Sequence, residues 1–155
     1  MYNPKFMAKA IELSIENIKR GGGPFGAVVV RNGEIISAEG NTVTLDNDPT
    51  AHAEVNAIRS ACRRLATFDL QGCEIYASCE PCPMCLSAIY WAHIDRIYYA
   101  ATRQDAALIG FDDKLIYDEI PMPQPARQIP GEQHDRNSAL AAFAAWTSTP
   151  NKTKY

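Results

Sequence analysis

Two short stretches of the sequence combine residue types that bind metals with a residue type that moves protons. The first, His52-Ala53-Glu54, joins an imidazole to a carboxylate, and the second, Pro81-Cys82-Pro83-Met84-Cys85, holds two thiols. Zinc prefers thiolate and imidazole ligands, and three such ligands leave open the fourth tetrahedral position that a catalytic zinc needs for water. We therefore predict that His52, Cys82 and Cys85 bind one zinc ion per chain.

Glu54 is the candidate proton carrier of such a site. A carboxylate beside a metal-activated water can shuttle a proton, for which a structural zinc site has no use. One difficulty is that His52 and Glu54 are two residues apart and would point to different sides of a regular helix. The difficulty is smaller in the opening turn of the helix, because Glu54 need only reach the water.

A further cysteine, Cys79, precedes the Cys82–Cys85 pair and leaves a choice open. If Cys79 also bound zinc, four ligands would close the site and the metal would be structural. We interpret Cys79 instead as lining the pocket floor or packing, since a free cysteine often behaves as a small buried hydrophobe. A redox role for the pair would need a thioredoxin-like context and would leave Cys79 unexplained.

The predicted elements place the candidate ligands at the starts of two helices. In chain order they are a helix from 4 to about 20, strands over 25–31 and near 35–36, a helix from about 48 to 65, a strand over 73–79, a helix over 83–92, a strand over 95–101, a short helix over 104–109, a proline-rich passage over 121–130 with a short edge strand near 127–129, and a helix over 138–146. Thiols three apart in a helix's first turn share one face, and the helix N-terminus favours the thiolate. The alternation of strands and helices predicts an α/β sandwich with helices on both faces of the sheet.

Composition bounds the class of protein. The chain has 155 residues, 46% of them apolar and 21% charged, which suits one soluble domain with a single core. The net charge is −3 and no basic run exceeds Arg63-Arg64, so nothing indicates nucleic-acid or membrane binding. The N-terminal stretch is amphipathic rather than continuously apolar, and five cysteines do not form a secreted disulfide pattern. We therefore expect a cytoplasmic protein.

With H-A-E and P-C-P-M-C in place, the chain resembles the cytidine deaminase-like superfamily, whose zinc-dependent members carry H-x-E followed by P-C-x-x-C. Other stretches are similar to the bacterial guanine deaminases of this superfamily: GGPFGAVVV at 22–30, EGNTVT at 39–44, NDPTAHAEVNAIR at 47–59, SCEPCPMCLSAIYWA at 78–92, GFDD at 110–113 and the terminal Lys154-Tyr155. The similarity extends over nearly the whole chain and weakens between about 119 and 150.

The resemblance implies a fold, a reaction and an assembly. The fold is a three-layer α/β/α sandwich with a five-stranded mixed sheet, and the assembly is a homodimer or larger oligomer. The reaction is hydrolytic, so that guanine and water give xanthine and ammonia. In it Glu54 takes the proton of the water, protonates the ring nitrogen and then serves the departing amine.

The resemblance also implies which residues meet the purine. Phe25, Asn41 and Asp113 match positions that hold the base, and we count Asp113 with Glu54 among the catalytic residues. Buried amide and carboxylate groups can read the polar edges of a purine and reject analogues that leave them unpaired. The remaining candidates for contact with the substrate are Ala53, Trp91, Phe111 and Tyr155.

The polar tail 147–155 is open to two interpretations. Composition alone makes it a frayed terminus. Similar guanine deaminases use a C-terminal segment to close over the active site, either their own or that of a partner subunit. We therefore treat 1–155 as one domain in which 147–155 is a tail or an active-site lid.

The residues alone are compatible with several other functions. A deaminase of transfer RNA adenosine shares both motifs, but the net charge of −3 is unlike an RNA-binding surface. Cytosine, adenine and guanosine are alternative substrates, and a zinc-stapled binding module is the non-catalytic alternative. Phe25, Trp91 and Phe111 could equally be core aromatics. We expect a small purine base as the binding partner, with no nucleic acid and no membrane.

Overall fold

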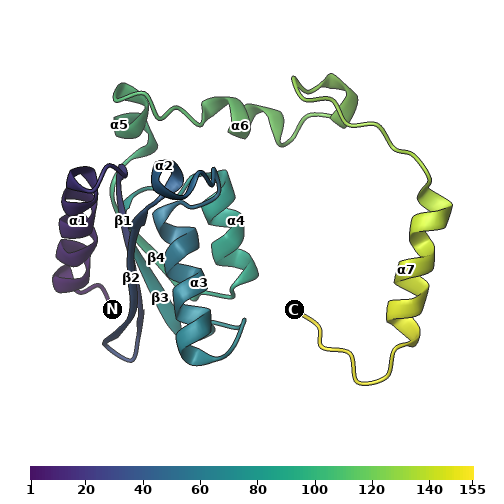
Figure 1. Ribbon diagram of the computed structural model, residues 1–155, viewed down its shortest axis with the longest axis horizontal. Coiled ribbons are helices and arrows are strands. Elements are labelled where there is room, and N and C mark those ends of the chain that lie inside the picture. Colours follow the sequence, from purple (N-terminus) through teal and green to yellow (C-terminus); the bar gives the residue numbers. More distant parts are fainter. The chain divides into compact units, whose positions relative to one another are not determined.

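The computed structural model describes residues 1–155 and contains one β-sheet with helices on both of its faces (Figure 1). The elements are α1 (Pro4–Lys19), β1 (Gly23–Arg31), β2 (Glu34–Asn41), α2 (Val43–Asp46), α3 (Ala53–Leu65), β3 (Cys73–Cys79), α4 (Pro83–Trp91), β4 (Arg96–Ala101), α5 (Arg103–Leu108), α6 (Lys114–Glu119), the 3-10 helix η1 (Gln124–Ala126) and α7 (Arg136–Ser148).

The sheet is mixed, with strand order β2-β1-β3-β4. The first two strands form a hairpin, in which Asn32 and Gly33 take positive φ values of 53° and 80° and so make the turn. β1 also pairs antiparallel with β3, and β3 runs parallel to β4. Helix α4 makes the crossover that a parallel pair requires.

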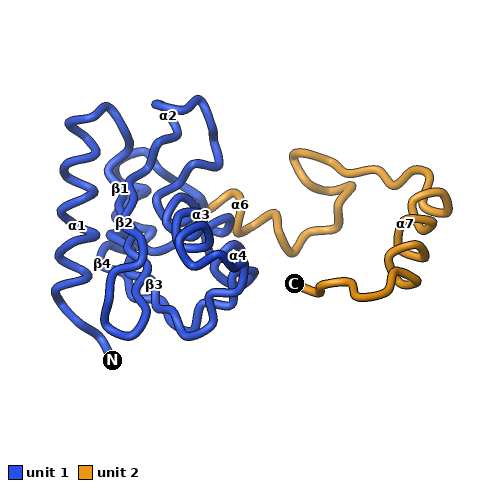
Figure 2. Tube along the Cα trace, turned by 60° about the horizontal axis from the view of Figure 1, so that its bottom comes forward, with its two compact units in different colours: residues 1–113 blue, residues 114–155 orange.

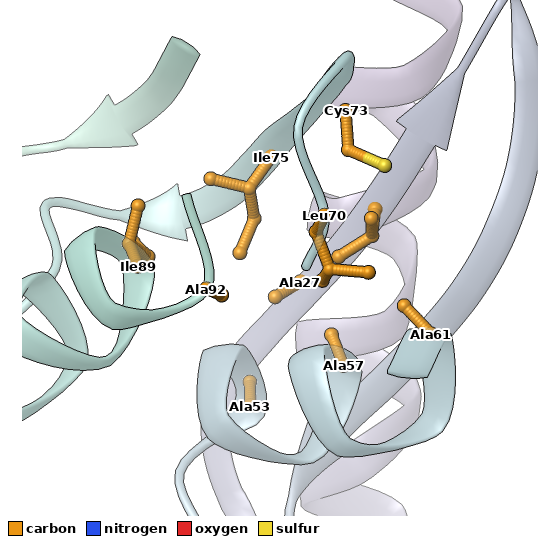
Figure 3. Packing of buried hydrophobic residues seen from close by; sticks show 10 residues of the cluster. Ala27, Ala53, Ala57, Ala61, Leu70, Cys73, Ile75, Ile89 and Ala92 are labelled. Atoms are coloured by element: carbon orange, nitrogen blue, oxygen red, sulfur yellow. The ribbon is translucent and has the colours of Figure 1, made fainter. Parts of the chain in front are cut away.

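The middle of β1 is buried on both faces of the sheet, which explains its continuous apolar run. Val28 and Val30 face the side covered by α1, where they pack with Tyr76 of β3. Ala27 and Val29 face the opposite side, toward α3 and α4. Figure 3 shows that core, in which small alanines of α3 let the helix approach the sheet closely; its labelled members are Ala27, Ala53, Ala57, Ala61, Leu70, Cys73, Ile75, Ile89 and Ala92.

The sheet has four strands, so the predicted fifth strand is wrong. The segment near 127–129, where an edge strand was expected, follows the 3-10 helix η1 and forms no ladder. Prolines at 121, 123, 125 and 130 remove backbone donors from this passage, and a strand cannot pair through residues that lack an N–H. The three-layer arrangement of helix, sheet and helix is present around the four strands.

The chain divides into two compact units, Met1–Asp113 and Lys114–Tyr155 (Figure 2). The first unit holds the whole sheet and both hydrophobic clusters. The second unit consists of α6, η1 and α7, and none of its residues is buried. No helix of the chain is both long and apolar enough to cross a bilayer.

Candidate active site

Two helix starts position the candidate metal ligands. His52 is the N-cap of α3 and Cys82 is the N-cap of α4, and both have extended backbone with ψ values of 154° and 170°. Neither side chain caps its own helix. The loop before His52 is fixed because Thr42, just after β2, donates its N–H to the carbonyl of Ala51 at 2.9 Å. The sheet and α3 therefore hold the imidazole in place.

The three predicted ligands come together. His52 Nδ1 lies 3.5 Å from Cys82 Sγ and 3.5 Å from Cys85 Sγ, and the ligand atoms of all three residues lie within 4.8 Å of one another. Cys85 is in the first turn of α4, three residues after Cys82, as the C-x-x-C spacing requires. Two sulfurs and one ring nitrogen form a donor set that fits zinc and leaves a fourth position for a non-protein ligand.

The electrostatics of the group favour metal binding. The Cys85 thiol donates to the Cys82 sulfur, and this hydrogen bond, together with His52, lowers the pKa of Cys82 to about 4. The same hydrogen bond raises the pKa of Cys85. The hydrogen bond between His52 and Cys82 raises the pKa of His52. Without metal the group thus holds one thiolate and shares its remaining protons, which zinc would displace.

Glu54 lies beside this group as a buried carboxyl. Its side chain is 8% exposed, and burial raises its pKa to about 7, with the charge of Cys82 adding to the effect. His52 lies outside the helix as its N-cap, whereas Glu54 is the second helical residue. The expected conflict between the directions of these two side chains therefore does not arise, because only one of them follows helical geometry. A carboxyl with a pKa near neutrality is well suited to accept and return a proton.

Cys79 stands apart from the metal group. It ends β3, is buried, and donates its thiol to the carbonyl of Thr102 at 3.5 Å. Burial raises its pKa to about 11, so it remains a neutral thiol at physiological pH. It is not among the residues whose ligand atoms converge. This placement agrees with the interpretation of Cys79 as a pocket-lining or packing residue.

Several of the predicted base-holding residues gather within the first unit. The rings of Phe25 and Phe111 meet edge to face, with centroids 5.0 Å apart and an interplanar angle of 88°. Asn41 ends β2 and is buried, and its Oδ1 accepts the N–H of Val43 at 3.2 Å. Burial, followed by the charge of Cys82, raises the pKa of Asp113, which therefore lies within electrostatic reach of the metal group.

The other predicted contacts differ in their setting. Ala53 is fully buried at the first position of α3, between His52 and Glu54. Trp91 is the last residue of α4, about 14 Å along the helix from Cys82 at about 1.5 Å per residue, and it is 64% exposed. Tyr155 ends the second unit and is exposed. The first unit by itself therefore does not bring Trp91 to the metal group, and the roles of Trp91 and Tyr155 stay predictions.

Asn56, which no motif of the sequence singles out, supports the loop that carries His52. Its Nδ2 donates to the Gly40 carbonyl at 3.0 Å, to Thr42 Oγ1 at 3.0 Å and to the Ala51 carbonyl at 3.2 Å. One amide thus joins the end of β2 to the residue before the histidine ligand. The available signal was an amide inside the NDPTAHAEVNAIR stretch, on the helix that carries the candidate proton carrier Glu54.

Comparison with known proteins agrees with this geometry. Residues 2–101 match the family described as the cytidine and deoxycytidylate deaminase zinc-binding region, and the chain belongs to this zinc-binding deaminase family. Over its full length it is 50% identical to the guanine deaminase of Bacillus subtilis, all of which it covers. The crystal structure of that enzyme matches with a TM-score of 0.96, covering 100% of this chain and 99% of the other.

Two further relatives are more distant. A guanine deaminase structure from Nitrosomonas europaea matches with a TM-score of 0.69 and 34% identity, covering 79% of this chain and 69% of that one. A tRNA-specific adenosine deaminase of Aquifex aeolicus is 44% identical over 62% of this chain and 64% of its own length. The family and the zinc predicted from the motifs are thereby confirmed.

Proposed function

We propose that this chain is a zinc-dependent hydrolytic deaminase that converts guanine and water into xanthine and ammonia. The observation that carries the proposal is a buried carboxyl, Glu54, next to a three-donor metal group in a chain that matches a guanine deaminase from end to end. A structural zinc site would offer four protein ligands and would have no need for a proton carrier.

The residues divide the chemistry as follows. His52, Cys82 and Cys85 hold zinc, which when bound supplies an activated water at neutral pH. Glu54 takes the proton released from that water and passes it to the purine ring nitrogen next to C2. As the C2–N bond breaks, the proton of the hydroxyl group now on C2 passes through Glu54 to the amine, which leaves as ammonia. The oxygen of the water remains on C2 of xanthine.

The pocket residues orient the base for this reaction. The edge-to-face pair of Phe25 and Phe111 offers an aromatic wall for the purine. Asn41 supplies an amide donor, and the Asp113 carboxyl can accept hydrogen bonds from purine N–H groups. Ala53, Trp91 and Tyr155 complete the proposed contacts. A site of this kind discriminates because a wrong base leaves buried polar groups unpaired.

We further propose a cytoplasmic homodimer. All five cysteines are free, which suits a reducing compartment. The second unit buries none of its residues, and its helix α7 leaves Leu140, Phe143 and Trp146 exposed. A segment without a core of its own gains stability by packing on another surface, and the tail 147–155 could reach the active site of its own chain or of a second copy.

The test is a comparison of substrates. Zinc-loaded protein is incubated with guanine, cytosine, adenine, guanosine or a transfer RNA anticodon stem-loop, and ammonia is measured. We expect rapid release from guanine, with xanthine as the product. Release from adenosine in the stem-loop alone would assign the chain to RNA editing, and no release from any substrate would favour a non-catalytic zinc module.

A further inference from the structure

Asn17 is a buried amide on the side of α1 that faces the sheet. It is 5% exposed and shares that side with Met7 and Ala10. A polar side chain in such a position is costly unless its hydrogen bonds are made. Its partners are therefore the first indication of what it does.

Asn17 ties together the ends of two strands. Its Nδ2 donates to the carbonyl of Gly23, the first residue of β1, at 2.7 Å and to the carbonyl of Asn41, the last residue of β2, at 2.6 Å. Gly23 and Asn41 are paired, but the ladder register shifts between Gly23 and Gly26. The amide therefore supplies hydrogen bonds where the regular ladder is interrupted.

Neighbouring glycines make room for this amide. A Cβ on Gly22 would lie 2.3 Å from Asn17 Nδ2, and a Cβ on Gly40 would lie 2.5 Å from Asn17 Oδ1. Side-chain carbons do not approach other atoms so closely, so any larger residue at either position would displace the amide. The local sequence is thus built around Asn17.

The group held in this way is Asn41, the proposed donor to the base. Its carbonyl is held by Asn17, and its Oδ1 is held by the N–H of Val43. Its Nδ2 donates to no group of the chain. This atom is also not sealed from solvent, because the Tyr98 hydroxyl alone is both fully buried and without a partner. The Asn41 Nδ2 is therefore available to a ligand. The backbone and the side chain of Asn41 are thus each held by one hydrogen bond, and its Nδ2 remains as a free donor.

We propose that Asn17 is a positioning residue that fixes Asn41 for recognition of the purine. The inference rests on the proposed function, since it assigns a role in binding the same substrate. Asn17 itself touches neither the substrate nor the metal group. A base-reading donor that shifts by about 1 Å can cost about 100-fold in rate, so its support matters.

The experiment is a double-mutant cycle on kcat/KM for guanine. Asn17→Asp keeps the shape of the side chain but turns its donor into an acceptor that faces two carbonyls. We expect kcat/KM to fall about 10- to 100-fold in the wild-type background. In an Asn41→Ala background the same change should alter kcat/KM by less than about twofold, because the positioned group is absent. Zinc content should stay unchanged in all four proteins.

Equal losses in both backgrounds would overturn the proposal, since a purely structural role does not depend on Asn41. If Asn17→Asp fails to fold, Asn17→Ser, whose hydroxyl is too short to reach both carbonyls, enters the same cycle. Ser37→Ala is the matched control, because Ser37 is also buried and its Oγ donates to the Ala57 carbonyl at 2.7 Å. It should lower stability and leave kcat/KM unchanged.

The two proposals fail in different ways. Wild-type protein that releases no xanthine from guanine would overturn the proposed function itself. Wild-type protein that turns over guanine, together with a cycle that shows no coupling, would overturn only the role of Asn17.

Discussion

Replacing Glu54 by glutamine should separate its chemical role from its structural cost. Glutamine keeps the size of the side chain but cannot exchange a proton. Because Glu54 is not a ligand, Glu54→Gln should retain its zinc, while guanine turnover should fall by at least about 100-fold, at the lower end of what general acid–base catalysis contributes.

The same substitution should raise the stability of the metal-free protein, although it lowers turnover. The pKa of Glu54 rises from 4.5 to about 7 in the folded chain. At about 1.36 kcal/mol per pH unit, the protonated carboxyl therefore contributes about 3 kcal/mol to the free energy of unfolding, relative to the ionised one. A raised pKa means that this contribution is fully present below pH 4.5 and is lost as the pH rises through 7. Glutamine carries no charge to desolvate. Metal-free Glu54→Gln should therefore match the wild type near pH 4.5 and exceed its free energy of unfolding by up to about 3 kcal/mol at pH 8.

Two measurements check this reasoning. Urea unfolding of chelator-treated proteins between pH 4.5 and 8 gives the stability difference, and xanthine formation by the zinc-loaded proteins gives turnover. Glu34→Gln, at an exposed carboxylate on β2, is the control and should change neither. A stability difference that does not vary with pH would refute the account of the buried charge, and near-normal turnover would refute the role as proton carrier.

Three other results are expected. Elemental analysis should find one zinc per chain, lost in Cys82→Ala and in Cys85→Ala but kept in Cys79→Ser; loss in the last variant would make Cys79 a ligand. In metal-free protein at pH 6, iodoacetamide should label Cys82 first, because the pKa of Cys82 is about 4 while that of Cys79 is about 11. Zinc should protect Cys82 from labelling, and mass spectrometry that shows Cys79 labelled first would contradict this prediction. Deleting 148–155 should leave the zinc and the fold intact but lower guanine turnover greatly, and unchanged kinetics would make the tail dispensable.

Local patterns predicted most of the first unit. Strand β1 and the β3-α4-β4 alternation appear where the sequence predicted them. The start of α3 was placed too early. Asp48 Oδ1 instead accepts from the N–H and the hydroxyl of Thr50, a side-chain turn that competes with helix, and α3 begins at Ala53.

Long-range packing decides features that a local pattern does not show. Helical spacing predicted α1 but not its orientation, since Ile11, Ile15 and Ile18 lie on its exposed side and Met7, Ala10 and Asn17 face the sheet. Periodicity alone does not reveal which of two apolar stripes meets a partner. The predicted fifth strand is absent because strand pairing needs backbone N–H donors, which the prolines of this passage lack.

The metal group was predictable because its ligands cluster in two short motifs with a known spacing. The supporting amides Asn17 and Asn56 were not, because each holds backbone carbonyls from distant segments. A sequence shows an amide's type but not which carbonyls the fold will bring to it. For Asn17 the only signal was a polar residue on a helix face that otherwise meets the core.

The positions of His52 and Cys82 have a consequence for how the chain fluctuates. Both occupy N-cap positions without capping their helices, so the first turns of α3 and α4 lack the side-chain acceptor that usually restrains opening amides. An ion bound to both residues would fasten the two ends to each other. Amide hydrogen exchange in these two turns should then slow together on metal binding, so that two helix ends distant in sequence open as a single cooperative unit.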